Sequence, residues 1–133
     1  MRLLLDTHTL IWFFADDARL PERAGSLIED AVNTCSISLA TPWEMAIKIS
    51  LGKLRTPYTP GAGLRNLLER NAITILSLEP EDFDWVTTLP FHHRDPFDRL
   101  LAVQALRLDL TLVSADPIFD RYGVRRAWPG GSA

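Results

Sequence analysis

Four acidic residues of the chain lie either directly after a predicted strand or within the first turn of a predicted helix: Asp6, Glu44, Asp98 and Asp116. In an open parallel sheet, ligands bind beyond the carboxyl ends of the strands, so acids at such places can meet at one edge. Two carboxylates about 4 Å apart repel each other by about 4 kcal/mol at an effective dielectric constant of about 20. A cluster of four must therefore raise its pKa values or bind cations.

The donor atoms of this set are all carboxylate oxygens. Such ligands suit Mg²⁺ or Mn²⁺, which bind carboxylates together with water molecules and substrate phosphate. The sequence has no spacing of Cys and His residues that is typical of a zinc site. The set therefore predicts a site for one or two divalent cations.

Each acid also has a simpler interpretation when it is taken alone. Asp6 and Asp116 can cap the helices that follow them, and Asp98 lies where the helix dipole favours an acid. Glu44 stands three residues after Thr41, which is the spacing of a capping box. Only the common placement of all four acids, which these interpretations do not explain, favours a functional site.

The elements that would position these acids alternate along the chain. Apolar or alternating runs predict strands at 2–6, 35–39, 73–76, 111–113 and 124–128. Periodicity, N-cap residues and prolines predict helices at 7–15, 21–32, 42–51, 64–71, 79–88 and 96–108, and a short one after Asp116. Thr41 is the predicted N-cap of the third helix, and Gly52 its end. This alternation predicts a three-layer α/β/α fold with a mostly parallel central sheet of four to five strands.

The composition is that of one ordinary domain. The chain has 133 residues, 47% of them apolar, and we expect a single domain over residues 1–128 and a disordered tail at 129–133. Its one cysteine cannot form an internal disulfide, and the N-terminus lacks the pattern of a secretory signal. The longest strongly apolar run, 10–15, is far shorter than the roughly 20 residues that cross a bilayer. We therefore expect a cytoplasmic protein with no membrane partner.

The net charge of −3 argues at first against a polyanionic partner, because proteins that bind nucleic acids usually carry a basic surface. If the four site acids are set aside, however, 13 of the 17 acidic residues remain, against 14 Lys and Arg. The rest of the chain is then about neutral. The overall charge does not exclude RNA.

Four segments of the sequence resemble the signature regions of PIN-domain proteins, specifically the VapC-like ribonuclease toxins of type II toxin–antitoxin systems. The segments are LLLDTHTLIW, ATPWEMAIKISLGKL, HRDPFDRLLAVQAL and LTLVSADPIF, and the resemblance extends from Met1 to about Trp128. The run from Asp95 to Ala102 is its most specific part. The family's metal-binding acids fall on the four residues named first: Asp6, Glu44, Asp98 and Asp116.

This resemblance implies a PIN-like fold and a Mg²⁺- or Mn²⁺-dependent endoribonuclease that hydrolyses RNA phosphodiester bonds. Asp6 is then the central ligand of one or two ions, and Asp98 and Asp116 complete the metal site. Glu44 is a further ligand or orients the attacking water. The resemblance also implies the role of a toxin, a homodimer, and a tight complex with a small cognate antitoxin whose tail blocks the site.

Three neighbours of these acids are candidates for supporting roles. Asp95 is an alternative to Asp98 as ligand, because the two lie three residues apart on one helix. We prefer Asp98, since Asp95 suits the N-cap before Pro96. Thr7 and Ser114 can hydrogen-bond to the acids, although ordinary capping and turn chemistry is the favoured interpretation of both.

Basic residues near the acids are candidates for binding the RNA backbone. They are Lys48, Arg94 and Arg99, with Lys53 and Arg55 nearby. His92 and His93 lie in a polar loop, and neither is assigned a role. Five aromatic residues are expected in the core or at a protein interface rather than against nucleobases: Trp12, Phe13, Phe14, Trp43 and Phe97.

Two other classes of function compete with this interpretation. A haloacid-dehalogenase-like phosphatase would carry an Asp-x-Asp-x-Thr pattern, but Asp6 is followed by Thr7, His8 and Thr9. The alternative that remains is a catalytically silent PIN fold that serves as an RNA-binding or scaffold module. Loss of one of the four acids would have favoured that module, and all four are present.

Overall fold

The apolar segments form the five strands of one parallel sheet in the computed structural model, which describes residues 1–129. The strands are β1 (Arg2–Leu5), β2 (Thr34–Ser38), β3 (Ile73–Leu76), β4 (Thr111–Val113) and β5 (Arg126–Ala127). Their order across the sheet is β3-β2-β1-β4-β5, and each neighbouring pair is parallel. The carboxyl ends of all five strands therefore lie at the same edge.

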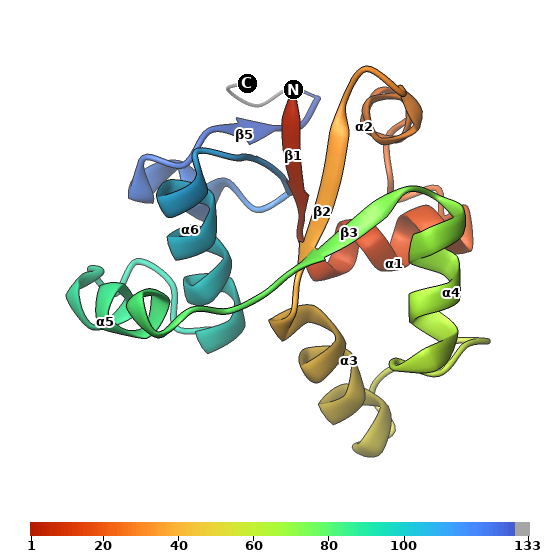
Figure 1. The fold of residues 1–133 in the computed structure, drawn as a ribbon, viewed down its shortest axis with the longest axis horizontal. Helices are drawn as coiled ribbons and strands as arrows, with labels where there is room; N and C mark the ends of the chain where they lie inside the picture. The colour runs from red at the N-terminus through yellow and green to blue at the C-terminus, as the bar shows by residue number, and fades with distance from the viewer. Residues whose placement is uncertain (130–133) are drawn as a thin grey trace.

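Helices connect these strands. They are α1 (Thr7–Ala15), α2 (Glu22–Glu29), α3 (Ala40–Ser50), α4 (Ala62–Arg70), α5 (Pro80–Thr88) and α6 (Pro96–Leu108), followed by the 3-10 helix η1 (Pro117–Tyr122). Figure 1 shows β1 and β2 at the centre of the molecule, with α5 and α6 on one side and α1 and α4 on the other. The predicted three-layer α/β/α fold is confirmed, and the strand and helix boundaries differ from the predicted ones by a few residues at most.

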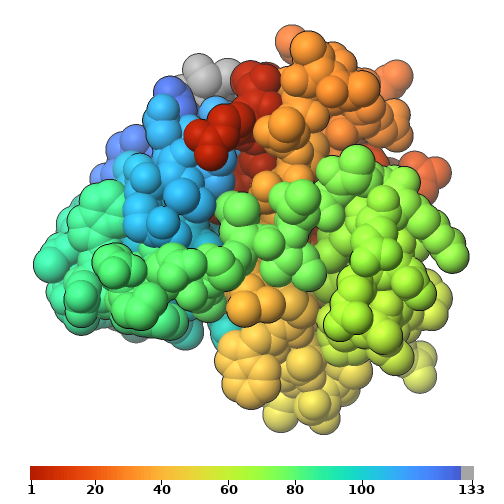
Figure 2. Space-filling view, in the orientation of Figure 1, coloured from red at the N-terminus to blue at the C-terminus, as the bar shows by residue number. Residues whose placement is uncertain are grey.

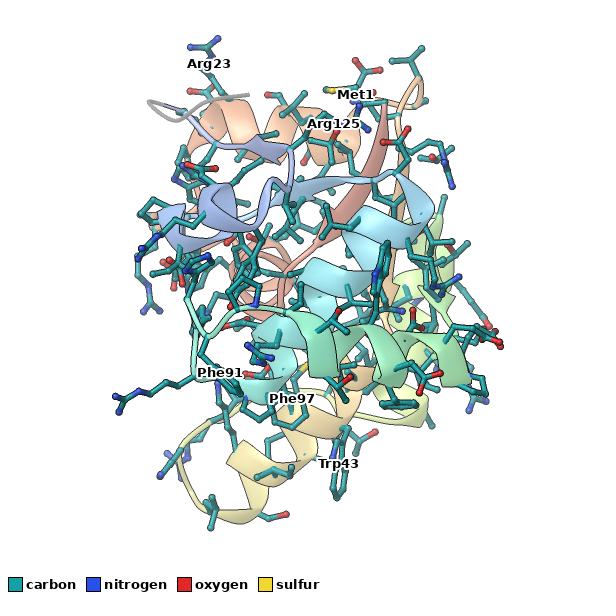
Figure 3. All side chains as sticks on the ribbon, turned by 90° about the vertical axis from the view of Figure 1, so that its left-hand side faces the viewer. Met1, Arg23, Trp43, Phe91, Phe97 and Arg125 are labelled. Atoms are coloured by element: carbon teal, nitrogen blue, oxygen red, sulfur yellow. The ribbon has the colours of Figure 1, made fainter. Side chains whose placement is uncertain are left out.

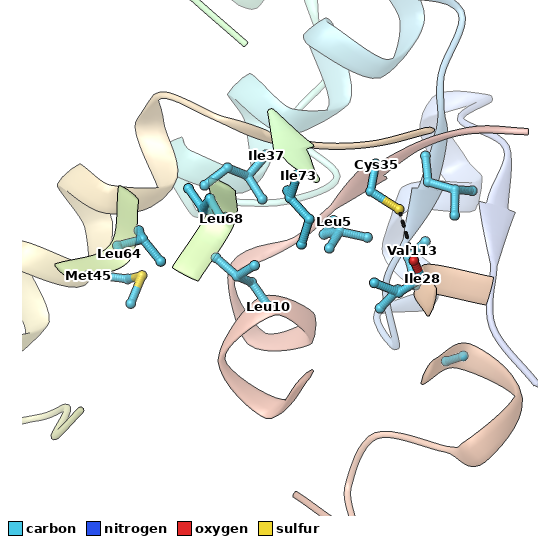
Figure 4. Packing of buried hydrophobic residues seen from close by; sticks show 12 residues of the cluster. Leu5, Leu10, Ile28, Cys35, Ile37, Met45, Leu64, Leu68, Ile73 and Val113 are labelled. Atoms are coloured by element: carbon cyan, nitrogen blue, oxygen red, sulfur yellow. Dashed lines mark hydrogen bonds between the residues drawn. The ribbon is translucent and has the colours of Figure 1, made fainter. Parts of the chain in front are cut away.

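Alternation along β1 separates two cores. Leu3 and Leu5 pack in a cluster with residues of α1, α2, α3 and α4, whereas Leu4 packs with residues of α6 and η1 on the opposite face. All three leucines are fully buried, and each such side chain stabilises the fold by about 1.5–3 kcal/mol. Figure 4 shows the first cluster, in which Leu5 and Leu10 lie among side chains of the neighbouring elements. Continuous apolar runs are thus the mark of strands covered on both faces.

The edges of the sheet are covered to different extents. β3 is an edge strand, and Figure 2 shows its segment on the molecular surface between α4 and α5. Ile75 of β3 is accordingly exposed. At the other edge β5 is only two residues long, and Arg126 within it is buried against Asp120 and the carbonyl of Ser114.

Two expectations concern the C-terminal tail and the membrane. Apart from Pro129, the tail predicted at 129–133 lies outside the described residues. Within residues 1–129, no helix combines the length and the apolar composition needed to cross a bilayer.

Candidate active site at the carboxyl edge of the sheet

Asp98, in the first turn of α6, lies where acids from several elements meet. Burial, and then the negative charges of neighbouring carboxylates, raise the pKa of Asp98 from its ordinary value of 3.8 to about 8. The neighbours responsible are Asp95, Asp6, Glu44 and Asp116. The structure therefore brings the four acids singled out in the sequence to one place, together with Asp95.

Asp6 directly follows β1 and caps α1. Its carboxylate accepts a 2.8 Å hydrogen bond from the backbone N–H of Thr9, and its own N–H donates to the carbonyl of Val113 at the end of β4. The side chain is buried, and this burial raises its pKa against the opposing effect of hydrogen bonds from Ser114 and Thr9. The predicted cap is real, and the carboxylate lies between the ends of two central strands as well.

For Glu44, the interpretation as part of a capping box with Thr41 is wrong. α3 begins at Ala40 with Leu39 as its N-cap, so Thr41 lies inside the first turn and forms no capping box with Glu44. Instead, Oε1 of Glu44 accepts a 2.7 Å hydrogen bond from the hydroxyl of Thr7, and Oε2 lies 2.7 Å from Nζ of Lys48. The buried carboxylate of Glu44 thus faces the other acids and is held at both oxygens.

The start of α6 separates the roles of its two acids. Oδ1 of Asp95 accepts hydrogen bonds from the backbone N–H groups of Phe97 and Asp98, at 2.8 and 3.3 Å. The prediction that Asp95 caps this helix is confirmed. Asp98 lies further into the first turn and does not cap the helix. Its carboxyl group lies near the other acids.

Asp116 follows β4, caps the 3-10 helix η1 and also faces the other acids. Its Oδ1 accepts a 3.0 Å hydrogen bond from the N–H of Ile118 at the start of η1, as expected for a cap. Its own N–H donates to Oγ of Ser114. Oδ2 points to a residue to which the sequence assigned no role, because it lies 3.1 Å from Nε2 of His93.

His93 is the site residue that the sequence analysis missed. Its Nε2 lies 3.0 Å from Oδ2 of Asp98 and 3.1 Å from Oδ2 of Asp116. The signal available in the sequence was its position two residues before the N-cap of α6. That position alone does not say which way a loop side chain points, so His92 and His93 looked equivalent.

Thr7 and Ser114 both contact the acids. Thr7 donates to Glu44, and Ser114 hydrogen-bonds to Asp6 and accepts from the N–H of Asp116. For Ser114 this includes the expected turn chemistry, whereas the hydroxyl of Thr7 links two helices rather than capping one. Both residues therefore hold acids in place.

The three basic candidates differ in what they can contact. Lys48 lies beside Glu44, and Arg94 is exposed in the loop before α6. The prediction that Arg99 contacts RNA is corrected, because Arg99 is buried. Its guanidinium donates to carbonyls in the last turn of α5 and just after it, and lies over the ring of Phe91. A direct contact between Arg99 and RNA would have to break these bonds.

The aromatic residues divide between the core and the surface. Trp12, Phe13 and Phe14 are half-buried, and Phe13 and Phe14 pack against the first core. Trp43 is 63% exposed, so it is not a core residue. Figure 3 shows Trp43, Phe91 and Phe97 at the same end of the molecule, opposite to Met1 and Arg125. This is the end to which α3 and the start of α6 belong.

The donor set fits a hard divalent cation. Asp6, Asp98 and Asp116 offer carboxylate oxygens, and ligand atoms of His93, Asp98 and Asp116 lie within 4.8 Å of one another. A cation among these carboxylates would offset the repulsion that raises the pKa of Asp98. Carboxylate oxygens with room for water are the ligands that Mg²⁺ and Mn²⁺ prefer.

Comparison with known proteins agrees with this fold. The family model of the PIN domain matches residues 3–125. The chain is similar to one in the crystal structure of VapBC2 from Rickettsia felis bound to a DNA fragment from their promoter, with a TM-score of 0.69 and 18% identity over 96% of this chain and 98% of that one. It is also similar to a chain of VapBC-1 from nontypeable Haemophilus influenzae, with a TM-score of 0.66 and 19% identity over 96% and 97% of the two chains. No curated protein matches the sequence.

Proposed function

Because this chain belongs to the PIN-domain family, we propose that it is a Mg²⁺- or Mn²⁺-dependent endoribonuclease that acts as the toxin of a toxin–antitoxin pair. One observation carries the proposal: four acids meet at the sheet edge, where burial and then the charges of Asp95 and of the other three acids raise the pKa of Asp98 to about 8. Groups perturbed by burial together with specific charged neighbours are concentrated at functional sites. A purely structural role for these acids does not require them to meet.

Three acids would hold the metal. Asp6 is the central ligand, because it lies between the ends of β1 and β4, and Asp98 and Asp116 complete the set. When bound, one or two divalent ions activate a water molecule and offset negative charge on the phosphoryl oxygens. The protein's own task is to fix the positions of these carboxylates.

Glu44 orients the attacking water in this proposal. Each of its oxygens accepts one hydrogen bond, from Thr7 or from Lys48, and a carboxylate has about four lone-pair sites. Lone pairs therefore remain for a water molecule, which Glu44 can hold and deprotonate. The ammonium group of Lys48, 2.7 Å from Oε2 of Glu44, can contact the phosphate of the RNA.

The proposed partners rest on the similar structures and on the exposed surface. Both are described as VapBC assemblies, so we propose a small cognate antitoxin, whose tail occupies the site, and a homodimer. Trp43 and Phe91 are 63% and 80% exposed at the same end of the molecule as the start of α6. Large apolar side chains in such positions favour a protein partner. RNA as the substrate implies a cytoplasmic location.

The test is cleavage of a labelled structured RNA by the purified chain with Mg²⁺, with Mn²⁺ and with a chelator. We expect cleavage that depends on the metal and that falls by at least about 100-fold in Asp6→Asn, since removal of a metal ligand removes its chemistry. Asp84→Asn is the matched control, because Asp84 is an exposed acid of α5 and the change in charge is the same.

Two results would contradict the proposal. Cleavage by Asp6→Asn at the rate of the wild type would indicate a contaminating nuclease. Binding of RNA without cleavage under either metal would favour the catalytically silent RNA-binding module.

A further inference from the structure

His93 lies in the loop between α5 and α6 and is held from several sides. Its backbone N–H donates a 2.8 Å hydrogen bond to the hydroxyl of Tyr122, and its ring packs against Phe119 of η1. Pro90, three residues earlier in the same loop, is held as well, because its carbonyl accepts a 3.0 Å hydrogen bond from Arg99 of α6. The side chain of His93 is only 21% exposed. A ring anchored in this way has one orientation, and that orientation aims Nε2 at Asp98 and Asp116.

The opposite nitrogen of the ring shows where the proton is. The backbone N–H of Asp95 donates a 3.1 Å hydrogen bond to Nδ1 of His93. A nitrogen that accepts an N–H carries no proton of its own, so the ring proton lies on Nε2. Nε2 therefore donates its one proton to Oδ2 of Asp116 at 3.1 Å, and Oδ2 of Asp98 lies 3.0 Å from the same nitrogen.

The proton of His93 lies on the opposite ring nitrogen from the one expected in a histidine that binds a metal at this place. A histidine ligand offers one bare nitrogen to the metal and donates a proton from the other nitrogen to a carboxylate or a carbonyl. In His93 the nitrogen near the acids carries the proton, and the bare nitrogen is already used by Asp95. The ring can become a ligand only if this hydrogen bond to Nδ1 is lost.

The donor leaves part of each carboxylate free. Within residues 1–129, Oδ1 of Asp98 accepts no hydrogen bond, and Oδ1 of Asp116 accepts one from Ile118. The hydrogen bond from Nε2 to Oδ2 of Asp116, and the close contact of Nε2 with Oδ2 of Asp98, limit the rotation of both carboxyl groups and so influence which oxygen atoms face the centre of the cluster. When a bound cation keeps both carboxyl groups ionised, the hydrogen on Nε2 also reduces the repulsion between them.

We propose that His93 is a positioning residue of the metal site, which orients Asp116 through a hydrogen bond from Nε2 and Asp98 through a close contact with the same nitrogen, and does not itself bind the metal. This inference rests on the proposed metal site. It adds a residue outside the four acids and assigns it a task that differs from theirs.

The first test reads the proton directly. In the full chain with ¹⁵N-labelled histidine, long-range ¹H–¹⁵N spectra distinguish protonated from bare ring nitrogens, and the signals that vanish in His93→Gln belong to His93. We expect Nε2 to be protonated without metal and to stay protonated when Mg²⁺ alone saturates the site. A bare Nε2 in the presence of Mg²⁺, with the proton moved to Nδ1, would make His93 a ligand and overturn the proposal.

The second test uses variants and the affinity for Mn²⁺ alone, measured by calorimetry. We expect His93→Ala to weaken binding by about 10- to 100-fold, as loss of a residue that orients metal ligands does. We expect His93→Gln to recover most of the affinity, because an amide nitrogen carries two N–H bonds and occupies the place of Nε2. Unchanged affinity in His93→Ala, or a His93→Gln variant as weak as His93→Ala, would contradict the proposal.

The neighbouring His92 provides the matched control. Its ring packs at a tilt against that of Tyr122, with ring centroids 5.0 Å apart, and within residues 1–129 it forms no hydrogen bond or ion pair with the acids. We expect His92→Gln to bind Mn²⁺ within about twofold of the wild type, as is usual for substitutions away from a site. Thermal melting of each variant checks that it folds.

These measurements separate the inference from the proposed activity. If metal binding depends on His93 but the chain cleaves no RNA, the inference about His93 holds and the proposed ribonuclease activity is contradicted. If neither ion binds the wild-type chain, the inference is wrong as well.

Discussion

The hydroxyl of Thr7 donates a 2.7 Å hydrogen bond to Oε1 of Glu44, and this bond joins the helix after β1 to the helix after β2. Both side chains are buried, so neither group has ready access to water as a substitute partner. The two helices are distant in sequence and meet only because β1 and β2 are neighbours in the sheet. The position of Glu44 therefore depends on a residue that precedes it by 37 positions.

Replacing Thr7 should impair catalysis while the fold is retained. Thr7→Val keeps the shape but removes the hydroxyl, so Glu44 loses one of its two donors. We expect single-turnover cleavage to fall by about 10-fold or more and the free energy of unfolding to fall by about 1–3 kcal/mol. Thr7→Ser is the control, because it retains the hydroxyl, and it should stay near the wild type in both measurements.

Asp95 and Asp98 should respond differently to the same change. Asn is a good N-cap residue, so Asp95→Asn preserves the two hydrogen bonds at the start of α6 and should retain most activity. Asp98→Asn removes a proposed ligand and should abolish measurable cleavage. Initial rates at saturating Mg²⁺ compare the two variants. An Asp95→Asn enzyme as inactive as Asp98→Asn would mean that both acids bind the metal.

Asp98 should make the metal-free protein less stable as the pH rises. Its pKa in the folded state is about 8, against an ordinary value of 3.8. A raised pKa gives a contribution to stability that is full below pH about 4 and is lost as the pH rises through about 8. In chelator at pH 8 we expect Asp98→Asn to be more stable than the wild type, by at most about 5 kcal/mol, since one pKa unit corresponds to about 1.4 kcal/mol. Urea unfolding from pH 4 to pH 8 measures the difference, which should shrink toward pH 4.

Added metal should reverse this loss of stability. A ligand at 100 times its dissociation constant stabilises the folded state by about 2.7 kcal/mol. We therefore expect Mg²⁺ or Mn²⁺ to raise the melting temperature of the wild type at pH 8, and much less at pH 5, where Asp98 is protonated. An equal rise in Asp98→Asn at pH 8 would show that the ion binds elsewhere.

Arg99 should matter for stability rather than for RNA contact. Its guanidinium donates to the carbonyls of Val86, Leu89 and Pro90, and Arg99→Met leaves these acceptors without that donor. We expect the free energy of unfolding to fall by about 2–4 kcal/mol in urea titrations. Arg94→Met, at an exposed position, is the control and should change stability by less than about 0.5 kcal/mol. If Arg99→Met is as stable as the wild type but binds RNA weakly, Arg99 contacts RNA after all.

The sequence by itself determined the order of the elements and the fold. Continuous apolar runs mark strands buried on both faces, as Leu3, Leu4 and Leu5 are, and the caps at Asp6 and Asp95 are local features. The rule that parallel strands end at one edge was enough to predict the meeting of the acids. These features depend only on neighbours in the sequence or on simple strand geometry.

Only the tertiary structure decided how the side chains around the acids are used. Glu44 has the spacing of a capping box, yet α3 starts one position before Thr41 and Thr7 from another helix binds the carboxylate. In the sequence, His93 was a loop residue without a role and Arg99 a candidate for binding RNA, but His93 points into the site and Arg99 supports the loop. Side-chain direction in a loop and the partner of a buried charge are set by contacts between segments far apart in the sequence, which local patterns do not record.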